Sequence, residues 1–196
     1  MRHLFTLLRF RPTDFVFIFG GYCIAFLVMK FSIEPLQARV LPQTTAFASI
    51  LFLPHGVRVL SVWMFRGRAF VPLFLAHLFI YSLFFWHDDS FLRHLGMISV
   101  GTLCAYFALG LFLASGINLS LKNFDIIHWR AILLLGLVAS IFNSVGNSLI
   151  MMNVIDAPLQ LQTMVIYLIG DTLGVFALLL VLGLGLRIFR GVQAAG

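Results

Sequence analysis

The chain has 196 residues, of which 61% are hydrophobic and only 10% are charged, and its formal net charge is +6. A soluble domain of ordinary composition carries about a quarter charged residues, so this composition excludes a water-soluble globular domain. Apolar runs of about 20 residues, the length that crosses a bilayer, recur along the whole sequence and are joined by short loops. We therefore expect one integral membrane domain over residues 1–196.

Six apolar runs predict six membrane spans. Each run is continuously apolar, whereas the strands of a membrane barrel alternate apolar and polar residues over about ten positions. A helix also satisfies its own backbone hydrogen bonds within lipid. The predicted fold is therefore all-α, a polytopic transmembrane helical bundle of about six spans. In chain order, the predicted spans cover residues 15–33, 44–65, 69–86, 95–117, 131–152 and 162–186.

The basic residues indicate the orientation of the bundle, because cytoplasmic loops are enriched in lysine and arginine. The larger set lies on one predicted side and places both termini in the cytoplasm. The net charge is thus mainly a topology signal, with some attraction for anionic lipid, and no nucleic-acid partner is expected. The larger set is Arg2, Arg9, Arg11, Arg66, Arg68, Lys122, Arg130, Arg187 and Arg190; the smaller set is Lys30, Arg39 and Arg93.

Arg58 belongs to neither set, because it lies inside the second apolar run in the motif Leu53-Pro54-His55-Gly56-Val57-Arg58. A charged side chain in hydrocarbon costs several kcal/mol, so this arginine must face the protein interior or a wet cavity. A charge in that position marks a functional site. Pro54 and Gly56 are able to break the second helix and change the depth of the residues that follow.

The fifth run carries a polar face formed by Gly136, Ser140, Asn143 and Asn147. Their spacing of four, three and four residues aligns them along one side of a helix, and we expect that side to point inward. One interpretation is hydrogen bonding between helices, which contributes about 0.6 kcal/mol per contact in membranes. The other interpretation is the wall of a polar pocket.

The sixth run contains Asp171, the only acidic residue well inside a predicted span. Its natural partner is Arg58, although a straight-helix count places the two at different depths. At about 1.5 Å per residue from the cytoplasmic ends of their spans, Arg58 lies roughly 10 Å deep and Asp171 roughly 24 Å deep. A direct pair therefore requires a break in the second helix or a bridging water. Gly170 and Gly174 flank Asp171 at a spacing that permits close approach of a neighbouring helix.

His55 and His77 fall at similar predicted depths on consecutive spans. Two such imidazoles are a possible ligand pair for haem or a metal, but the favoured interpretation is that each is neutral and makes a hydrogen bond inside the bundle. We expect no cofactor and no metal site. The sequence also lacks a nucleophile elbow, a glycine-rich phosphate loop and a zinc-protease motif, so we expect no enzyme and assign no catalytic residue.

Three motifs carry a resemblance to a known family. They are Leu53-Pro54-His55-Gly56-Val57-Arg58, Gly67-Arg68-Ala69-Phe70-Val71-Pro72 and Gly170-Asp171-Thr172-Leu173-Gly174-Val175. In this order they resemble elements of the membrane-associated sensor (MASE) family, first type. The resemblance implies a bacterial sensory membrane module of the kind usually fused to histidine kinases or cyclic-dinucleotide enzymes. The chain departs from that pattern, because the family commonly has about eight spans and an output domain.

These observations together predict a multi-pass protein of the bacterial inner membrane that resembles a free-standing sensory or ligand-binding domain. Such a domain signals through a separate protein partner or a homo-oligomer, and its other contact is the lipid bilayer. The alternatives are a structural or assembly subunit of a larger membrane complex, in which Arg58 and Asp171 lock helices together, and a small transporter. The predicted ligand-binding or buried polar site consists of Arg58, Asp171, His55, Asn143 and Asn147.

Overall fold

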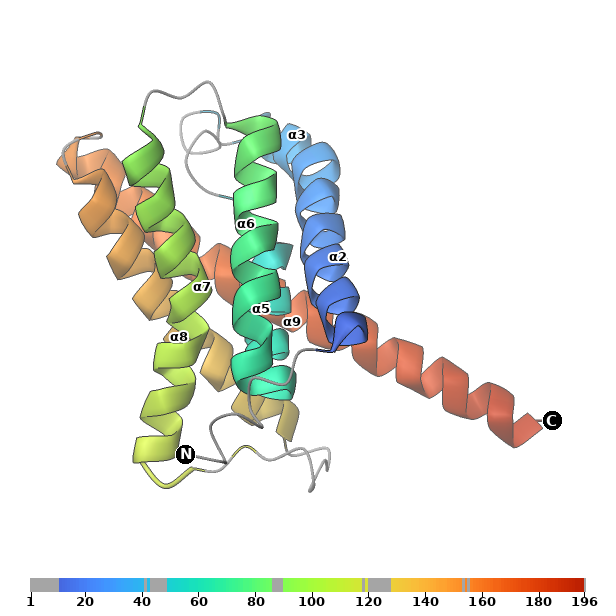
Figure 1. Ribbon diagram of the computed structural model, residues 1–196. Helices are drawn as coiled ribbons and strands as arrows, with labels where there is room; N and C mark the ends of the chain where they lie inside the picture. The colour runs from blue at the N-terminus through green and yellow to red at the C-terminus, as the bar shows by residue number, and fades with distance from the viewer. Residues whose placement is uncertain are drawn as a thin grey trace.

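The computed structural model describes residues 11–40, 42, 49–85, 90–117, 119, 128–152, 154 and 156–195. Every secondary-structure element in these ranges is a helix, which confirms the all-α prediction (Figure 1). The elements are α2 (Pro12–Val28), the π-helix η1 (Met29–Ile33), α3 (Glu34–Gln37), α5 (Leu53–Phe65), the 3-10 helix η2 (Arg66–Ala69), α6 (Phe70–Phe84), α7 (Phe91–Ala114), α8 (His128–Met151) and α9 (Ala157–Ala195).

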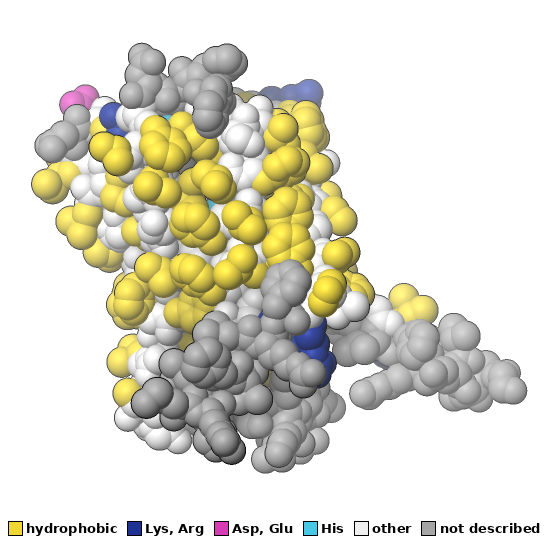
Figure 2. Space-filling view, viewed as in Figure 1, with side chains coloured by type: hydrophobic (Ala, Val, Ile, Leu, Met, Phe, Trp, Pro, Cys, Tyr) yellow, Lys and Arg dark blue, Asp and Glu magenta, His cyan; other side chains and the backbone are white. Residues whose placement is uncertain are grey.

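Five helical stretches are long and apolar enough to cross a membrane. Apolar side chains cover the middle of the face shown in Figure 2, and the charged side chains visible there lie near the two ends of the bundle. This distribution matches a protein whose middle faces lipid and whose ends face water, so the chain is a multi-pass helical membrane protein. The stretches are Pro12–Gln37, Leu53–Phe84, Phe91–Ala114, Trp129–Met151 and Ala157–Gly185.

The stretch Leu53–Phe84 combines parts of two predicted spans, 44–65 and 69–86, because the chain reverses within it at Arg66. The backbone φ of Arg66 is +53°, a conformation that ends α5, and η2 then leads into α6. At about 1.5 Å per residue α5 is only about 20 Å long, which is shorter than the hydrocarbon core of about 30 Å. Six crossings of the membrane, with both termini in the cytoplasm, therefore remain a prediction.

Contacts with α2 establish the reversal. α5 runs antiparallel to α2, since Val57 lies beside Gly21 and Arg68, just after α5, pairs with Asp14 at 2.5 Å. α6 runs parallel to α2, because ring contacts follow the same order along both helices. These contacts join Phe19 to Phe79 and Phe26 to Phe84, each with ring centroids 5.5 Å apart.

The prediction of one continuous helix over residues 44–65 is wrong. Residues 43–48 lie outside the described part of the chain, residues 49–52 are not helical, and α5 begins only at Leu53. Pro54 stands in the first turn of α5, where its missing N–H has no intrahelical partner to lose. The proline therefore starts the helix instead of breaking it.

The non-helical segment 49–52 lies against α9. The N–H of Phe52 donates to the carbonyl of Gly170 at 3.0 Å, and the N–H of Ile50 donates to the side-chain Oε1 of Gln37 at 2.7 Å. A Cβ at Gly170 would overlap the carbonyl oxygen of Ser49, and a Cβ at Gly174 would overlap that of Phe52. The two glycines thus allow the non-helical segment 49–52 to pack closely on α9. The sequence had predicted that a neighbouring helix would pack there.

Non-helical backbone at membrane depth is tolerated only where protein or a wet cavity surrounds it. The two donors described above have protein acceptors, and the helix that follows also packs closely on α9. A Cβ at Gly56 would lie 2.8 Å from the carbonyl oxygen of Gly174. This backbone contact fixes where α5 begins and how deep its residues lie.

The other helices differ from the predicted spans mainly in their ends. α2 starts at Pro12, which is well suited to the first turn of a helix, and its continuation through η1 and α3 reaches Gln37. α7 and α8 each start three to four residues before the predicted spans 95–117 and 131–152, and α9 continues to Ala195. α6 ends at Phe84, two residues before the predicted end of the third span at 86.

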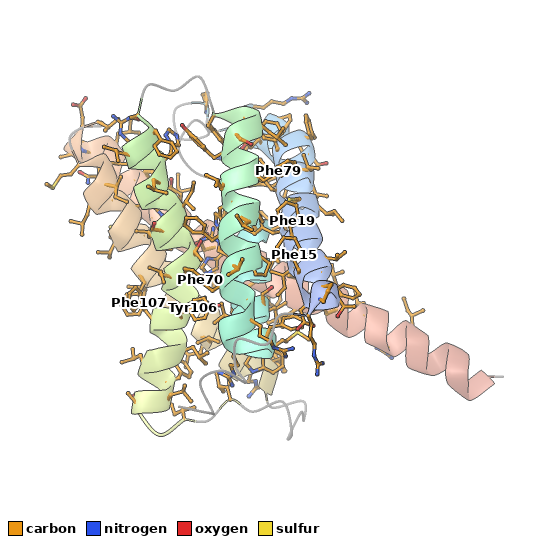
Figure 3. All side chains as sticks on the ribbon, viewed as in Figure 1. Phe15, Phe19, Phe70, Phe79, Tyr106 and Phe107 are labelled. Carbon is orange, nitrogen blue, oxygen red and sulfur yellow. The ribbon has the colours of Figure 1, made fainter. Side chains whose placement is uncertain are left out.

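Aromatic side chains join the helices on the face shown in Figure 3. Phe15 stacks on Phe19 along α2, and Phe19 in turn contacts Phe79 of α6. At the other end of α6, Phe70 meets Tyr106 of α7 edge-on, with ring centroids 6.1 Å apart. Each such pair contributes about 0.5–1.5 kcal/mol beyond its buried area, so these contacts hold α2, α6 and α7 in one bundle.

Candidate ligand-binding site

A cavity of about 450 Å³ lies inside the bundle. Its volume falls within the range of about 300–1,000 Å³ that is typical of small-molecule sites. Lys30 and Glu34 line it near the end of the α2–η1–α3 stretch, and Arg93 lines it near the start of α7. α3 and the start of α7 lie at the same end of the bundle (Figure 1). From there the lining reaches inward to Arg58 and Asn143.

Arg58 lies at the inner part of this cavity and is 3% exposed. Its Nη1 group donates to the carbonyl of Gly101 at 3.1 Å and to Oδ1 of Asn143 at 3.4 Å, and it lies 3.8 Å from Sγ of Cys104. The guanidinium carbon lies 5.1 Å from the centroid of the Phe52 ring. Among the described residues, neither Nε nor Nη2 has a hydrogen-bond partner.

Asn143 stands between Arg58 and Asp171. Its Oδ1 accepts from Arg58, and its Nδ2 donates to Oδ2 of Asp171 at 2.6 Å. The assignment of oxygen and nitrogen is consistent, since a guanidinium only donates and a carboxylate only accepts. Arg58 and Asp171 do not approach within 4 Å of each other in this fully described part of the site. The predicted direct ion pair is therefore replaced by an amide bridge.

Asp171 instead has His55 as its nearest ionisable neighbour. Nδ1 of His55 lies 3.3 Å from Oδ2 of Asp171, and both side chains are fully buried. The other ring nitrogen, Nε2, lies 3.2 Å from the carbonyl oxygen of Gly136. His55 is the third residue of α5, so the start of that helix at Leu53 is what brings the imidazole to α8 and α9.

The contact between His55 and Asp171 requires a shared proton. Because the carbonyl of Gly136 only accepts, Nε2 of His55 must carry a hydrogen, and in the neutral ring Nδ1 then holds a lone pair. Two lone pairs facing each other repel, so a proton must lie either on Nδ1 or on Oδ2 of Asp171. The alignment is not that of a regular hydrogen bond, and Oδ1 of Asp171 is also buried without a partner among the described residues.

The polar face predicted on the fifth span is confirmed as an inward face of α8. Ser140, Asn143 and Asn147 are all buried, and Gly136 supplies the carbonyl for His55. Nδ2 of Asn147 donates at 2.9 Å to Oδ1 of Asn143, which keeps that amide oriented between its two charged neighbours. Both interpretations of this face therefore apply. Ser140 bonds to α9, Asn147 lines the cavity, and Asn143 does both, since it bonds to α5 and α9 and also lines the cavity.

His77 lies beside the guanidinium and does not share a site with His55. Its Nδ1 lies 2.9 Å from the carbonyl of Leu73 on its own helix, and its ring lies on the Tyr22 ring with centroids 4.3 Å apart. A Cβ at Gly101 would lie 3.1 Å from both Nε2 of His77 and Nη1 of Arg58. Absence of a side chain at position 101 thus leaves room for both groups.

The structure brings together the five predicted site residues in one chain of contacts. It adds residues that sequence reasoning did not select, of which Tyr22, Phe52 and Gly101 contact the charged part of the cavity. Tyr22 and Phe52 are aromatic residues in apolar runs, and no local pattern separates them from residues that face lipid. Gly101 had a weak signal, since a glycine within a helix often marks a close approach.

The arrangement is suited to holding an anion. A buried guanidinium with unused N–H groups ends a cavity, and its nearest carboxylate is held at the far side of an amide. Among the described residues, no group of three or more His, Cys, Asp or Glu side chains lies close enough to hold a metal ion. Comparison with protein-family models, with curated proteins and with solved structures finds no match to this chain.

Proposed function

We propose that this protein is a membrane-embedded receptor that binds a small anion at Arg58 and passes the bound state to a protein partner. The observation that supports this proposal is that Arg58 is buried at the inner part of a 450 Å³ cavity while its Nη2 group, which an atom in the cavity can reach, has no partner among the described residues. A buried positive charge is costly unless it is paired, and a bound anion supplies an acceptor and an opposite charge together.

The position of Asp171 supports a receptor over a purely structural ion pair. A lock between helices brings the two charges into contact, whereas here Asn143 separates them. The carboxylate lies against His55 instead. Arg58 therefore keeps positive charge that is available to a ligand, which is the property a receptor needs and a subunit of a complex does not.

The same contacts provide a route from ligand to helix packing. An anion on Arg58 competes with Oδ1 of Asn143 and with the carbonyl of Gly101 for the guanidinium hydrogens. Loss of these contacts loosens α5 from α7 and α8 at Arg58, while the contact of His55 with Gly136 and the glycine contacts with α9 remain. A ligand shifts such an equilibrium only if it binds one packing better than the other. The resemblance to the MASE family supports readout of the two packings by a separate partner.

A small transporter is the second candidate, and the interrupted second crossing favours it. Transporters commonly place a discontinuous helix at the substrate site near the bilayer midplane, and segment 49–52 followed by α5 is such an element. Uptake of an anion into proteoliposomes tests it directly. Arg58-dependent accumulation inside the vesicles supports a transporter, and binding without accumulation supports a receptor.

The receptor function is tested by thermal unfolding of purified protein in lipid nanodiscs with a panel of sodium salts. A ligand that binds only the folded state at 100 times its Kd stabilises by about 2.7 kcal/mol, which raises the unfolding midpoint. We expect at least one organic anion to raise it in the natural protein and not in Arg58→Gln. The matched control is Arg130→Gln, because Arg130 is exposed and does not line the cavity. An identical response in Arg58→Gln contradicts the proposal.

The partner is tested separately by chemical crosslinking in native membranes with and without the anion that stabilises the protein. A receptor that signals through a partner gives a crosslinked band whose intensity changes with the anion. A band that is stoichiometric and indifferent to the anion supports the structural-subunit alternative.

A further inference from the structure

We infer that the ligand of this cavity is a monoanionic carboxylate with a flat apolar body, such as an aromatic carboxylate. This inference rests on the proposed function, because it names the class of anion that Arg58 receives. It follows from three independent features of the site: the charge that is available, the edge of the guanidinium that is unused, and the composition of the walls.

The charge at the inner part of the cavity matches one negative charge. Near the mouth, Lys30 is already paired with Glu34 at 2.7 Å, so Arg93 supplies the net positive charge of that wall. At the inner part, Arg58 is the only arginine or lysine among the described residues, and His55 and Asp171, which share one proton, are neutral as a pair. A phosphate dianion needs more positive charge and more donors than this, and its desolvation cost is larger.

The unused donors are Nε and Nη2, which lie on one edge of the guanidinium. Nη1 is engaged by Gly101, Asn143 and Cys104, so the opposite edge remains. The two N–H groups of such an edge point in parallel and match the two oxygens of a carboxylate. Nη2 is the one of the two that an atom the size of a water oxygen can reach, because Nε has almost no exposed surface. A carboxylate therefore binds Nη2 first and engages Nε when the Arg58 side chain shifts toward the cavity.

The walls are aromatic and apolar. Tyr22 lies on His77 near the guanidinium, and Tyr81 lies on His94 nearer the mouth, with ring centroids 4.3 and 4.6 Å apart. Phe52 covers Arg58. Flat faces of this kind favour a planar ring, because offset and edge-to-face aromatic contacts add to the burial of apolar area. A straight acyl chain gains only the burial of its apolar area and none of these ring contacts.

The test measures binding by isothermal titration calorimetry with benzoate as the probe and protein in nanodiscs. Acetate supplies the carboxylate without the ring, benzamide supplies the ring without the charge, inorganic phosphate supplies a different anion, and octanoate stands for a straight-chain carboxylate from the bilayer. We expect benzoate to bind at least about tenfold more tightly than each of these four, which is a difference of about 1.4 kcal/mol.

Two variants separate the charge from the walls. Arg58→Lys keeps a cation but loses the paired donors, so benzoate affinity should fall at least about tenfold. Met97→Trp places a larger side chain in the cavity, in the space where the benzoate ring would lie, and leaves Arg58 intact. The affinity for benzoate should therefore fall, while the affinity for acetate should stay the same. Met97→Trp decides the question even if Arg58→Lys does not fold. Arg130→Gln is the matched control outside the cavity and should bind benzoate as the natural protein does.

The outcomes distinguish the inference from the proposed function. If acetate, octanoate or phosphate binds as tightly as benzoate, and binding depends on Arg58, the anion receptor stands and the aromatic carboxylate is overturned. If benzamide binds as tightly as benzoate, the carboxylate is overturned. If Met97→Trp leaves benzoate binding unchanged, the location in the cavity is overturned. If no anion in the panel of salts or in this titration binds, the proposed function fails together with the inference.

Discussion

The amide of Asn143 donates to the carboxylate of Asp171 across 2.6 Å in the interior of the bundle. The same amide accepts from Arg58 and from Asn147, so one neutral side chain separates and orients two buried ionisable groups. Nε of Arg58 and Oδ1 of Asp171 have no partner among the described residues, so the bonds to Asn143 supply much of what compensates the burial of the two groups. Stability and ligand binding therefore both depend on this amide.

Replacement of Asn143 by alanine should destabilise the protein by about 1–3 kcal/mol, because it leaves groups of Arg58 and Asp171 buried without partners. Asn147→Ala is the comparison: it also removes a buried amide of α8, but the atoms that Asn147 contacts keep other donors. Its effect should be smaller. Thermal unfolding in nanodiscs measures both, and an equal loss in the two variants would show that the bridge has no special role.

Gly170→Ala and Gly174→Ala should each destabilise by about 3 kcal/mol or more, because the new methyl group overlaps the backbone of segment 49–52. Gly183→Ala on the same helix is the matched control, since a Cβ there has no neighbour within 4 Å. That control should be neutral or more stable by about 0.5–1 kcal/mol, as alanine favours a helix over glycine. Unfolding midpoints and expression level report the difference, and a tolerant Gly174→Ala would contradict the docking of this segment.

Asp171→Asn should destabilise the protein and leave anion binding nearly unchanged. Oδ2 of Asp171 makes both contacts, with Nδ2 of Asn143 and with Nδ1 of His55, so the asparagine atom in that place either accepts from Asn143 or donates to His55. Loss of the other contact should cost about 1–3 kcal/mol. Because His55 and Asp171 share one proton and are neutral as a pair, the substitution removes no net charge, and benzoate affinity should change by less than about threefold. Thermal unfolding and calorimetry measure the two effects, and a tenfold rise in benzoate affinity would contradict the shared proton.

The reversal between α5 and α6 offers a test of backbone conformation at Arg66. Its φ of +53° is unfavourable for a residue with a Cβ and natural for glycine. Arg66→Gly and Arg66→Ala both lose the bond from the guanidinium to the carbonyl of Leu119. Arg66→Gly should therefore be more stable than Arg66→Ala by about 1 kcal/mol. Chemical or thermal unfolding of the pair checks this, and the reverse order would contradict the turn.

The sequence allowed the polar face of α8 to be predicted because that pattern is local. Ser140, Asn143 and Asn147 lie on one side of any helix that contains them, whatever surrounds it. The burial of Arg58 was predictable for a similar reason, since a charge inside an apolar run must avoid lipid. These predictions depend only on helix geometry and solvation.

The partner of Asp171 was not predictable, because it depends on where α5 starts. A run of apolar residues before Leu53 is typical of a continuing helix, and a continuing helix leaves His55 in an arbitrary direction. Contact with the glycines of α9 overrides that local preference and sets the register of α5. The cavity was missed for a related reason, since its walls come from several helices and its aromatic residues resemble those that face lipid.

The depth of Arg58 is set by main chain touching main chain at Gly56, Gly170 and Gly174. Side chains that line the cavity, such as Met97 and Ile98, take no part in that contact. Substitutions in the walls can therefore change which molecule fits without displacing the charge that holds it. The fold separates the fixed anchor of a ligand from the variable surface that selects it, which makes this bundle a natural starting scaffold for receptors with altered specificity.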